Sequence, residues 1–147
     1  MTERYVHALW CDDIRQEIGN KPSFMGAYVG GITVPLLPTL LPRLSVYVWV
    51  TTAIEHPFEK AIVKITRDDG FLVAQLNADN LDQNMSQFPQ HEDAKNFVLM
   101  FGISLSGVEL PDSCKYFTVS VETESETLEG PKLRVSVDPD LYANPKQ

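Results

Sequence analysis

The stretch of sequence that decides the fold runs from residue 96 to residue 137: NFVLMFGISLSGVELPDSCKYFTVSVETESETLEGPKLRVSV. In three segments of it, 97–105, 117–121 and 133–137, apolar residues alternate with smaller or polar ones. A period of two places one face of a strand against a core and the other face in water. A polar turn around Gly130 separates the last two segments. This third of the chain therefore predicts antiparallel strands.

The rest of the chain carries similar patterns and almost no helical periodicity. Extended structure is predicted at 23–29 and, after a bend or bulge at Gly30-Gly31, at 32–34. Further strands are predicted at 4–11, 44–52, 59–67 and 71–77. The last two form a hairpin around Asp68-Asp69-Gly70, because glycine tolerates the positive φ of a tight turn. We expect polar connections at 12–17 and at 78–93, the second with at most a helical turn at 81–85.

Together these patterns predict an all-β chain, an antiparallel immunoglobulin-like β-sandwich of seven or eight strands. We expect one domain over residues 1–138 and a surface tail over residues 139–147. The length of 147 residues fits a single domain, and the content of 44 % hydrophobic and 22 % charged residues is that of an ordinary globular protein.

Charge and cysteine content narrow the classes of partner and compartment. The net charge is -8, and the twelve basic residues are scattered, so we predict no nucleic-acid partner and no membrane partner. No export signal is visible, and no apolar run approaches the ~20 residues that span a bilayer. Cys11 and Cys114 are therefore expected to be reduced thiols in the cytoplasm, with a bridge possible only if their strands are neighbours.

A short motif supports the immunoglobulin-like prediction. Residues 110–118, LPDSCKYFT, resemble the entrance to the sixth strand of immunoglobulin-like domains. The resemblance implies that Tyr116 is the tyrosine of the corner, with its hydroxyl bonded to nearby backbone. Thr118 stands where antibody domains carry their second disulfide cysteine, so that bridge is absent. Trp49 stands where such domains often place a core tryptophan.

The N-terminal part carries a second resemblance. The segments CDDIRQE at 11–17 and SFMGAY at 23–28, with Lys21 between them, are similar to a family of short bacterial and bacteriophage proteins. That family is known chiefly as a domain of unknown function. The resemblance implies a bacterial or phage origin and an intracellular setting, and it brings no catalytic residues.

Asp12 and Asp13 are the candidate residues for binding a small ligand or ion. One interpretation is a divalent-ion site, with calcium as the ion, because hard cations bind several oxygens that converge from loops. The other is a polar connection whose carboxylates bind backbone amides or pair with Arg15 and Lys21, because Asp is common in turns. Two further acidic pairs lie far away in the sequence, and no twelve-residue calcium loop occurs.

The sequence shows no pattern of catalytic residues. The two cysteines and three histidines lack the paired spacing of a zinc site. No Gly-x-Ser-x-Gly elbow occurs, and no histidine is near Cys114. We therefore predict a protein that is not an enzyme and has no metal and no cofactor. An active site dispersed over loops stays open as an alternative, because sandwich folds host unrelated functions.

Residues 35–43, PLLPTLLPR, combine three prolines with four leucines: Leu36, Leu37, Leu40 and Leu41. Proline disfavours both a helix interior and a central strand. If the leucines are exposed, they form an apolar patch of the kind that marks interfaces. If they cover an open end of the sandwich, they belong to the core.

The function that follows is a non-catalytic protein-interaction module, which binds a partner protein or self-associates through the leucines of this segment. The alternative is a sandwich that binds a small ligand or a divalent ion at Asp12 and Asp13. The acidic residues of 122–129, ETESETLE, either steer a basic partner or form a solvated turn.

Overall fold

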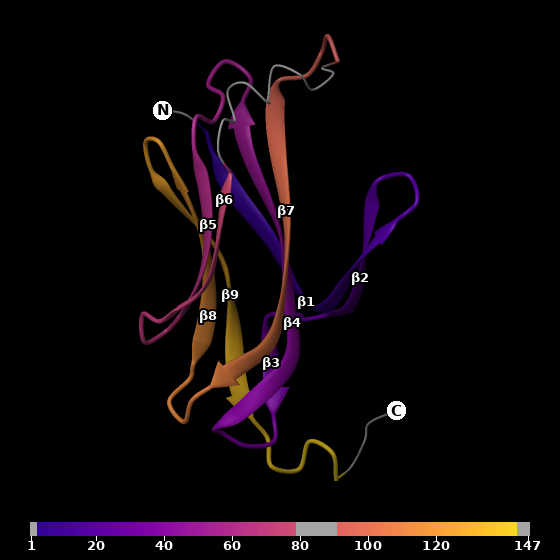
Figure 1. The fold of residues 1–147 in the computed structure, drawn as a ribbon, viewed down its shortest axis with the longest axis vertical. Helices are drawn as coiled ribbons and strands as arrows, with labels where there is room; N and C mark the ends of the chain where they lie inside the picture. Colours follow the sequence, from indigo (N-terminus) through magenta and orange to yellow (C-terminus); the bar gives the residue numbers. More distant parts are fainter. Residues whose placement is uncertain (1–2, 79–90, 144–147) are drawn as a thin grey trace.

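The structure is a computed structural model that describes residues 3–78 and 91–143. These residues form two β-sheets and no helix (Figure 1). Sheet A has the order β2-β1-β4-β7 and contains β1 (Tyr5–Glu17), β2 (Lys21–Ala27), β4 (Thr39–Ala53) and β7 (Asn96–Leu110). Sheet B has the order β3-β9-β8-β5-β6 and contains β3 (Gly31–Val34), β5 (Ala61–Arg67), β6 (Leu72–Ala78), β8 (Tyr116–Thr123) and β9 (Thr127–Val137). The all-β prediction is confirmed.

Two parts of the prediction lie wholly or partly outside the described residues. These are the loop at 78–93 with its helical turn at 81–85, and the end of the tail at 139–147. Up to Ala143, the tail continues from β9 in short turns, in which the Leu141 amide donates to the Asp138 carbonyl at 3.1 Å. None of the described segments is a helix with the length and apolar character that crossing a membrane requires.

The described part contains nine strands, where the sequence predicts seven or eight, and one pair is not antiparallel. β3 runs parallel to β9, with Ile32 opposite Val135. The chain changes sheets at Gly30, whose φ of 81° lies in the left-handed region. Because of this break, β2 and β3 join different sheets and count as separate strands.

The predicted polar connection at 12–17 is instead strand. β1 continues to Glu17, turns at Gly19 and Asn20, and returns as β2 with Glu17 opposite Lys21. The loop between the two strands is Ile18-Gly19-Asn20, in which Gly19 and Asn20 have positive φ, 89° and 60°. The apolar alternation is lost because this ribbon leaves the body of the molecule, so residues 15–21 are all exposed.

β4 begins earlier than the prolines of 35–43 suggest. This strand starts at Thr39 rather than at Leu44 and includes Pro42. The ladder to β7 joins Leu41 to Val108 and Arg43 to Ser106, and it skips the proline between them. β1 joins the other side of β4 only from Ser45 onward. Proline is tolerated here because this part of β4 has a neighbouring strand on one side only.

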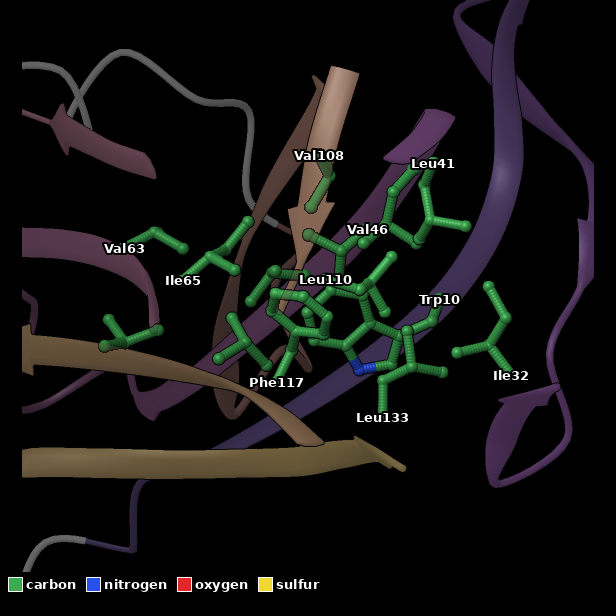
Figure 2. Packing of buried hydrophobic residues seen from close by; sticks show 14 of the residues in the cluster. Trp10, Ile32, Leu41, Val46, Val63, Ile65, Val108, Leu110, Phe117 and Leu133 are labelled. Atoms are coloured by element: carbon green, nitrogen blue, oxygen red, sulfur yellow. The ribbon is translucent and has the colours of Figure 1, made fainter. Parts of the chain in front are cut away.

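The core lies between the two sheets and is centred on β4. Val46, Val48 and Val50 point inward and are fully buried, together with side chains such as Val63 and Phe117 of sheet B. Figure 2 shows part of this cluster, with the Trp10 indole at its centre. Trp10 is 4 % exposed, and its Nε1 donates a hydrogen bond to the carbonyl of Pro131 at 3.2 Å.

Two details that the immunoglobulin resemblance implies do not hold. Trp49 is not the core tryptophan, because it alternates with the buried valines and points to the outer face of sheet A, where it is half-buried. Trp10 of β1 occupies the core instead. The side-chain hydrogen bonds of the described residues include none from the Tyr116 hydroxyl, and Lys132 Nζ lies 4.3 Å from the centre of its ring.

Arg4, directly before β1, closes one end of the sandwich. Its side chain is 3 % exposed, and its Nη2 lies 2.5 Å from the carboxylate of Glu124. Its Nε donates to Thr52 Oγ1 at 3.0 Å and its Nη1 to Ser125 Oγ at 3.2 Å. The guanidinium also lies 4.6 Å from the centre of the Phe58 ring. This one side chain therefore joins β1, the end of β4 and the β8–β9 turn.

The ion pair makes stability depend on pH. Burial raises the pKa of Glu124, but hydrogen bonds from backbone amides and from Arg4 outweigh it, so the pKa lies below its ordinary value of 4.5. A carboxylate with a lowered folded-state pKa stabilises the fold above its unfolded pKa. That contribution is lost as the pH falls through the folded-state value.

Replacement of Arg4 tests this contact. Arg4→Met should lower the free energy of unfolding by roughly 2–3 kcal/mol at neutral pH, because it leaves Glu124 without its cation. Arg4→Lys should restore only part of this loss, since lysine lacks the planar set of five donors. Urea denaturation as a function of pH should show the difference between wild type and Arg4→Met shrinking below pH 4.5. A difference that stays constant to acidic pH would contradict the assignment.

Candidate functional site

The four leucines predicted to bind a partner occupy two different environments. Leu36 and Leu40 are 56 % and 57 % exposed, respectively. Leu37 is half-buried against the core, and Leu41 is 9 % exposed and belongs to the core. Leu40 and Leu41 point to opposite sides because both lie in β4, where successive side chains alternate. The exposed part of this segment is therefore Leu36 and Leu40, which we call the β3–β4 patch.

Leu40 of the β3–β4 patch lines a shallow depression of about 400 Å³ at the end of sheet A. Pro38, Thr39 and Leu40 line one side, and Glu109, Leu110 and Pro111 line the other. The two sides are held together because Leu40 pairs with Glu109 in the ladder between β4 and β7. A rigid strand and a proline on each side fix the shape of this surface, so a partner side chain could enter without rearranging the backbone.

Asp12 and Asp13 do not converge on a common point. Asp12 Oδ1 accepts a short hydrogen bond from the hydroxyl of Tyr28. Asp13 Oδ2 lies 3.0 Å from Arg43 Nη1. These partners differ from the predicted Arg15 and Lys21, because residues 12–17 form a strand and not a turn. In the part of the chain that the structure describes, no group of three or more His, Cys, Asp or Glu side chains could hold a metal ion.

The other acidic pairs also have partners within the protein. Asp68 Oδ1 accepts the Lys115 amide at 3.1 Å, and Asp69 Oδ2 lies 2.7 Å from Arg67 Nη2. Asp138 Oδ1 accepts the amide of Asp140 at 3.0 Å. The contacts of Asp69 and Asp138 fix turns, which is the common local use of aspartate, whereas Asp68 joins the β5–β6 turn to the residue before β8.

The acidic hairpin is partly neutralised by the protein itself. Glu122 Oε2 lies 2.5 Å from Lys64 Nζ, and this hydrogen bond lowers the pKa of Glu122. Glu124 pairs with Arg4. Glu126 and Glu129 are exposed. The field that could steer a basic partner is therefore weaker than the run of four glutamates suggests.

A cluster that sequence reasoning missed lies at the base of the β1–β2 ribbon. The Tyr28 amide donates to the Trp10 carbonyl at 2.8 Å, which brings Tyr28 beside Asp12. Burial raises the pKa of Tyr28, and the hydrogen bond to Asp12 raises it further. Gly26 has a φ of 65°, and a Cβ at this position would collide with the carboxylate of Asp12. The segments CDD and GAY are therefore in contact. The sequence indicated only that both belong to the N-terminal resemblance.

The two cysteines are buried free thiols. Burial raises the pKa of Cys11, and the charges of Asp12 and Asp13 add to the effect. Burial likewise raises the pKa of Cys114 to about 11. Both thiols are protonated near neutral pH, so neither is a ready nucleophile.

Two glycine substitutions separate the Asp12 contact from backbone strain. Gly26→Ala should destabilise the protein by roughly 1 kcal/mol through its positive φ and by about 1–2 kcal/mol more because Asp12 must leave Tyr28. Gly30→Ala is the matched control, because Gly30 has a φ of 81° and open space around the added Cβ. Urea denaturation of both variants measures the difference. Equal losses would show that the Asp12–Tyr28 contact contributes nothing.

Comparison with known proteins adds no family to these observations. No family model matches the chain, and no curated protein is similar to it in sequence. The resemblance to short bacterial and bacteriophage proteins stays a prediction from the residues. Any functional conclusion therefore depends on the geometry described above.

Proposed function

We propose that the protein is a non-catalytic interaction module that binds a partner protein through the β3–β4 patch. The observation that carries this proposal is the exposure of Leu36 and Leu40, of which Leu40 lines a depression with rigid walls. Apolar side chains around such a depression gain by burial in a complex, since each loses its contact with water. The partner contributes an apolar side chain to the depression.

The patch carries one acidic group at its border, Glu109. A partner with a basic residue at the rim of its contact surface complements this charge and the overall charge of -8. No specific observation favours the alternative of a ligand or ion at Asp12 and Asp13, because each carboxylate has its own protein partner.

We also propose that the sandwich is immunoglobulin-like. Strands β1, β4 and β7 have the order of strands A, B and E in that fold, and β9, β8 and β5 have the order of G, F and C. The position of Tyr116 at the start of β8 supports this correspondence. A bacterial or phage origin and an intracellular setting remain predictions that rest on the N-terminal resemblance.

The partner surface can be tested by affinity capture from a lysate of the source organism. The double variant Leu36→Lys/Leu40→Lys should lose a stoichiometric partner that the wild type retains, because two charges replace the apolar contact. Leu72→Lys is the matched control, since Leu72 is 44 % exposed on sheet B and lies outside the patch. Retention of the partner by the double variant, with an unchanged thermal melt, would rule out this surface.

A second measurement addresses the ion alternative. Any ion that binds only the native state raises the melting temperature. We expect no shift with calcium for the wild type. A shift that disappears in Asp12→Asn/Asp13→Asn would favour the ion-binding function instead.

A further inference from the structure

β4 presents apolar side chains on both of its faces. Its valines face the core, while Tyr47 and Trp49 point to the outer face of sheet A. An antiparallel sheet with one face in water normally has polar residues on that face. Here the Phe24 ring of β2 reaches over the sheet to meet Tyr47 and Trp49, with ring centres 5.2 and 5.9 Å apart, respectively. Sheet A therefore has an aromatic cluster where a solvated surface is expected.

The ladder registers define the side chains that share this outer face. His7 and Met100 lie on either side of Trp49, and Tyr5 and Val98 lie on either side of Thr51. We call the following set the outer face: Tyr5, His7, Leu9, Cys11, Ile14, Phe24, Arg43, Ser45, Tyr47, Trp49, Thr51, Val98, Met100, Gly102, Ser104 and Ser106. Cys11, Ser45 and Thr51 of this set are buried. Arg43 is the charged member of the set, and its Nη1 lies 3.0 Å from Asp13 Oδ2, so this ion pair adds no net charge to the face, in a chain with a net charge of -8. Aromatic residues and methionine are enriched in interfaces, and charged residues are depleted from their centres.

The β1–β2 ribbon borders the outer face and projects from the body of the molecule (Figure 1). In the described structure β2 is hydrogen-bonded only to β1. Ile18 at the ribbon tip is 96 % exposed. A two-stranded ribbon that stands alone in water is marginally stable. Residues 13–27 carry two acidic and two basic side chains, so this part of the ribbon adds no net charge.

A groove of about 350 Å³ runs between the ribbon and the rest of the outer face. Ile14 and Gln16 line it from β1, Tyr47 from β4, and Met100, Gly102 and Ser104 from β7. The groove exists because Gly102 has no side chain to fill the space beside Tyr47. Met100 stands at its border and is 59 % exposed. A protruding side chain and a hollow therefore lie side by side on one surface.

We propose that the outer face and the ribbon form the interface of a symmetric dimer with a second copy of this chain. A two-fold axis brings the same patch of both copies together, so each Met100 enters the groove of the other copy. Each ribbon then lies over the opposite sheet, which supports both strands and covers Ile18. This interface is separate from the β3–β4 patch, and either proposal can fail without the other.

Charge and area favour a second copy as the occupant. Two chains with a charge of -8 repel each other, and the outer face brings them together without placing like charges in contact. The three strands β1, β4 and β7, about 4.8 Å apart and about nine residues long, cover roughly 15 Å by 30 Å, or about 900 Å² over both copies. The two-stranded ribbons, about seven residues long, add roughly 400 Å², which brings the total to the lower end of specific interfaces.

Sedimentation and light scattering over a dilution series test the dimer. The wild type should have twice the 16.5 kDa mass of one chain at high concentration and should dissociate on dilution. Met100→Lys should raise the dimer dissociation constant by roughly a hundredfold or more, because it buries an unpaired charge. Leu40→Lys is the matched control, with 57 % exposure against 59 % for Met100, and should leave the dimer intact. A wild type that is monomeric at all concentrations overturns the proposal.

Tryptophan fluorescence identifies the surface that is buried. The chain has two tryptophans, and Trp10 is in the core, so a change in emission on dilution reports Trp49. Wild-type emission should shift to the red as the dimer dissociates, and Met100→Lys should be red-shifted at all concentrations. Ile18→Asp at the solvated tip should weaken the dimer without affecting the fold. A dimer that survives both Met100→Lys and Ile18→Asp uses another surface, such as the open edge of β7, and overturns this interface.

Discussion

The inward row of valines on β4 is the constraint on which the rest of the structure depends. Val46, Val48 and Val50 are completely buried, and β4 has neighbours on both sides, β1 and β7. Burial of a valine side chain contributes roughly 1.5–3 kcal/mol, so a shift of one residue would lose this row and move Tyr47 and Trp49 into the core. The register of β4 therefore fixes which side chains of β1 and β7 face inward and which form the outer face.

The charged residues then determine how one end of the sandwich is closed and which carboxylates already have partners within the protein. Arg4 and Glu124 join the N-terminus to the β8–β9 turn, and Asp12 holds Tyr28 at the base of the ribbon. The carboxylates that suggest an ion site in the sequence thus have structural partners. The apolar surfaces on which our two proposals rest are the β3–β4 patch and the outer face of sheet A. We propose that each of them binds another protein chain.

The candidate site was predictable in part. The leucines of 35–43 could be recognised as candidates because so many apolar residues beside prolines are unusual. Which of them are exposed and which are buried could not be predicted, since Leu40 and Leu41 differ only in the side of β4 to which they point. The roles of Gly26 and Tyr28 could not be predicted, because their contact with Asp12 spans the ribbon. Asp13 pairs with Arg43 across two strands, and sequence distance suggested nearer cations.

The sequence by itself determined the class of fold, the hairpin at Asp68–Gly70 and most strand positions, because period-two alternation and turn chemistry are local properties. It did not determine that 12–17 is a strand, that β3 runs parallel to β9, or which tryptophan is buried. The tertiary structure decided these points, since each depends on which strands become neighbours. Trp10 and Trp49 have similar local patterns, and only the pairing of β1 with β4, and the packing of sheet A on sheet B, places one in the core and the other on the surface.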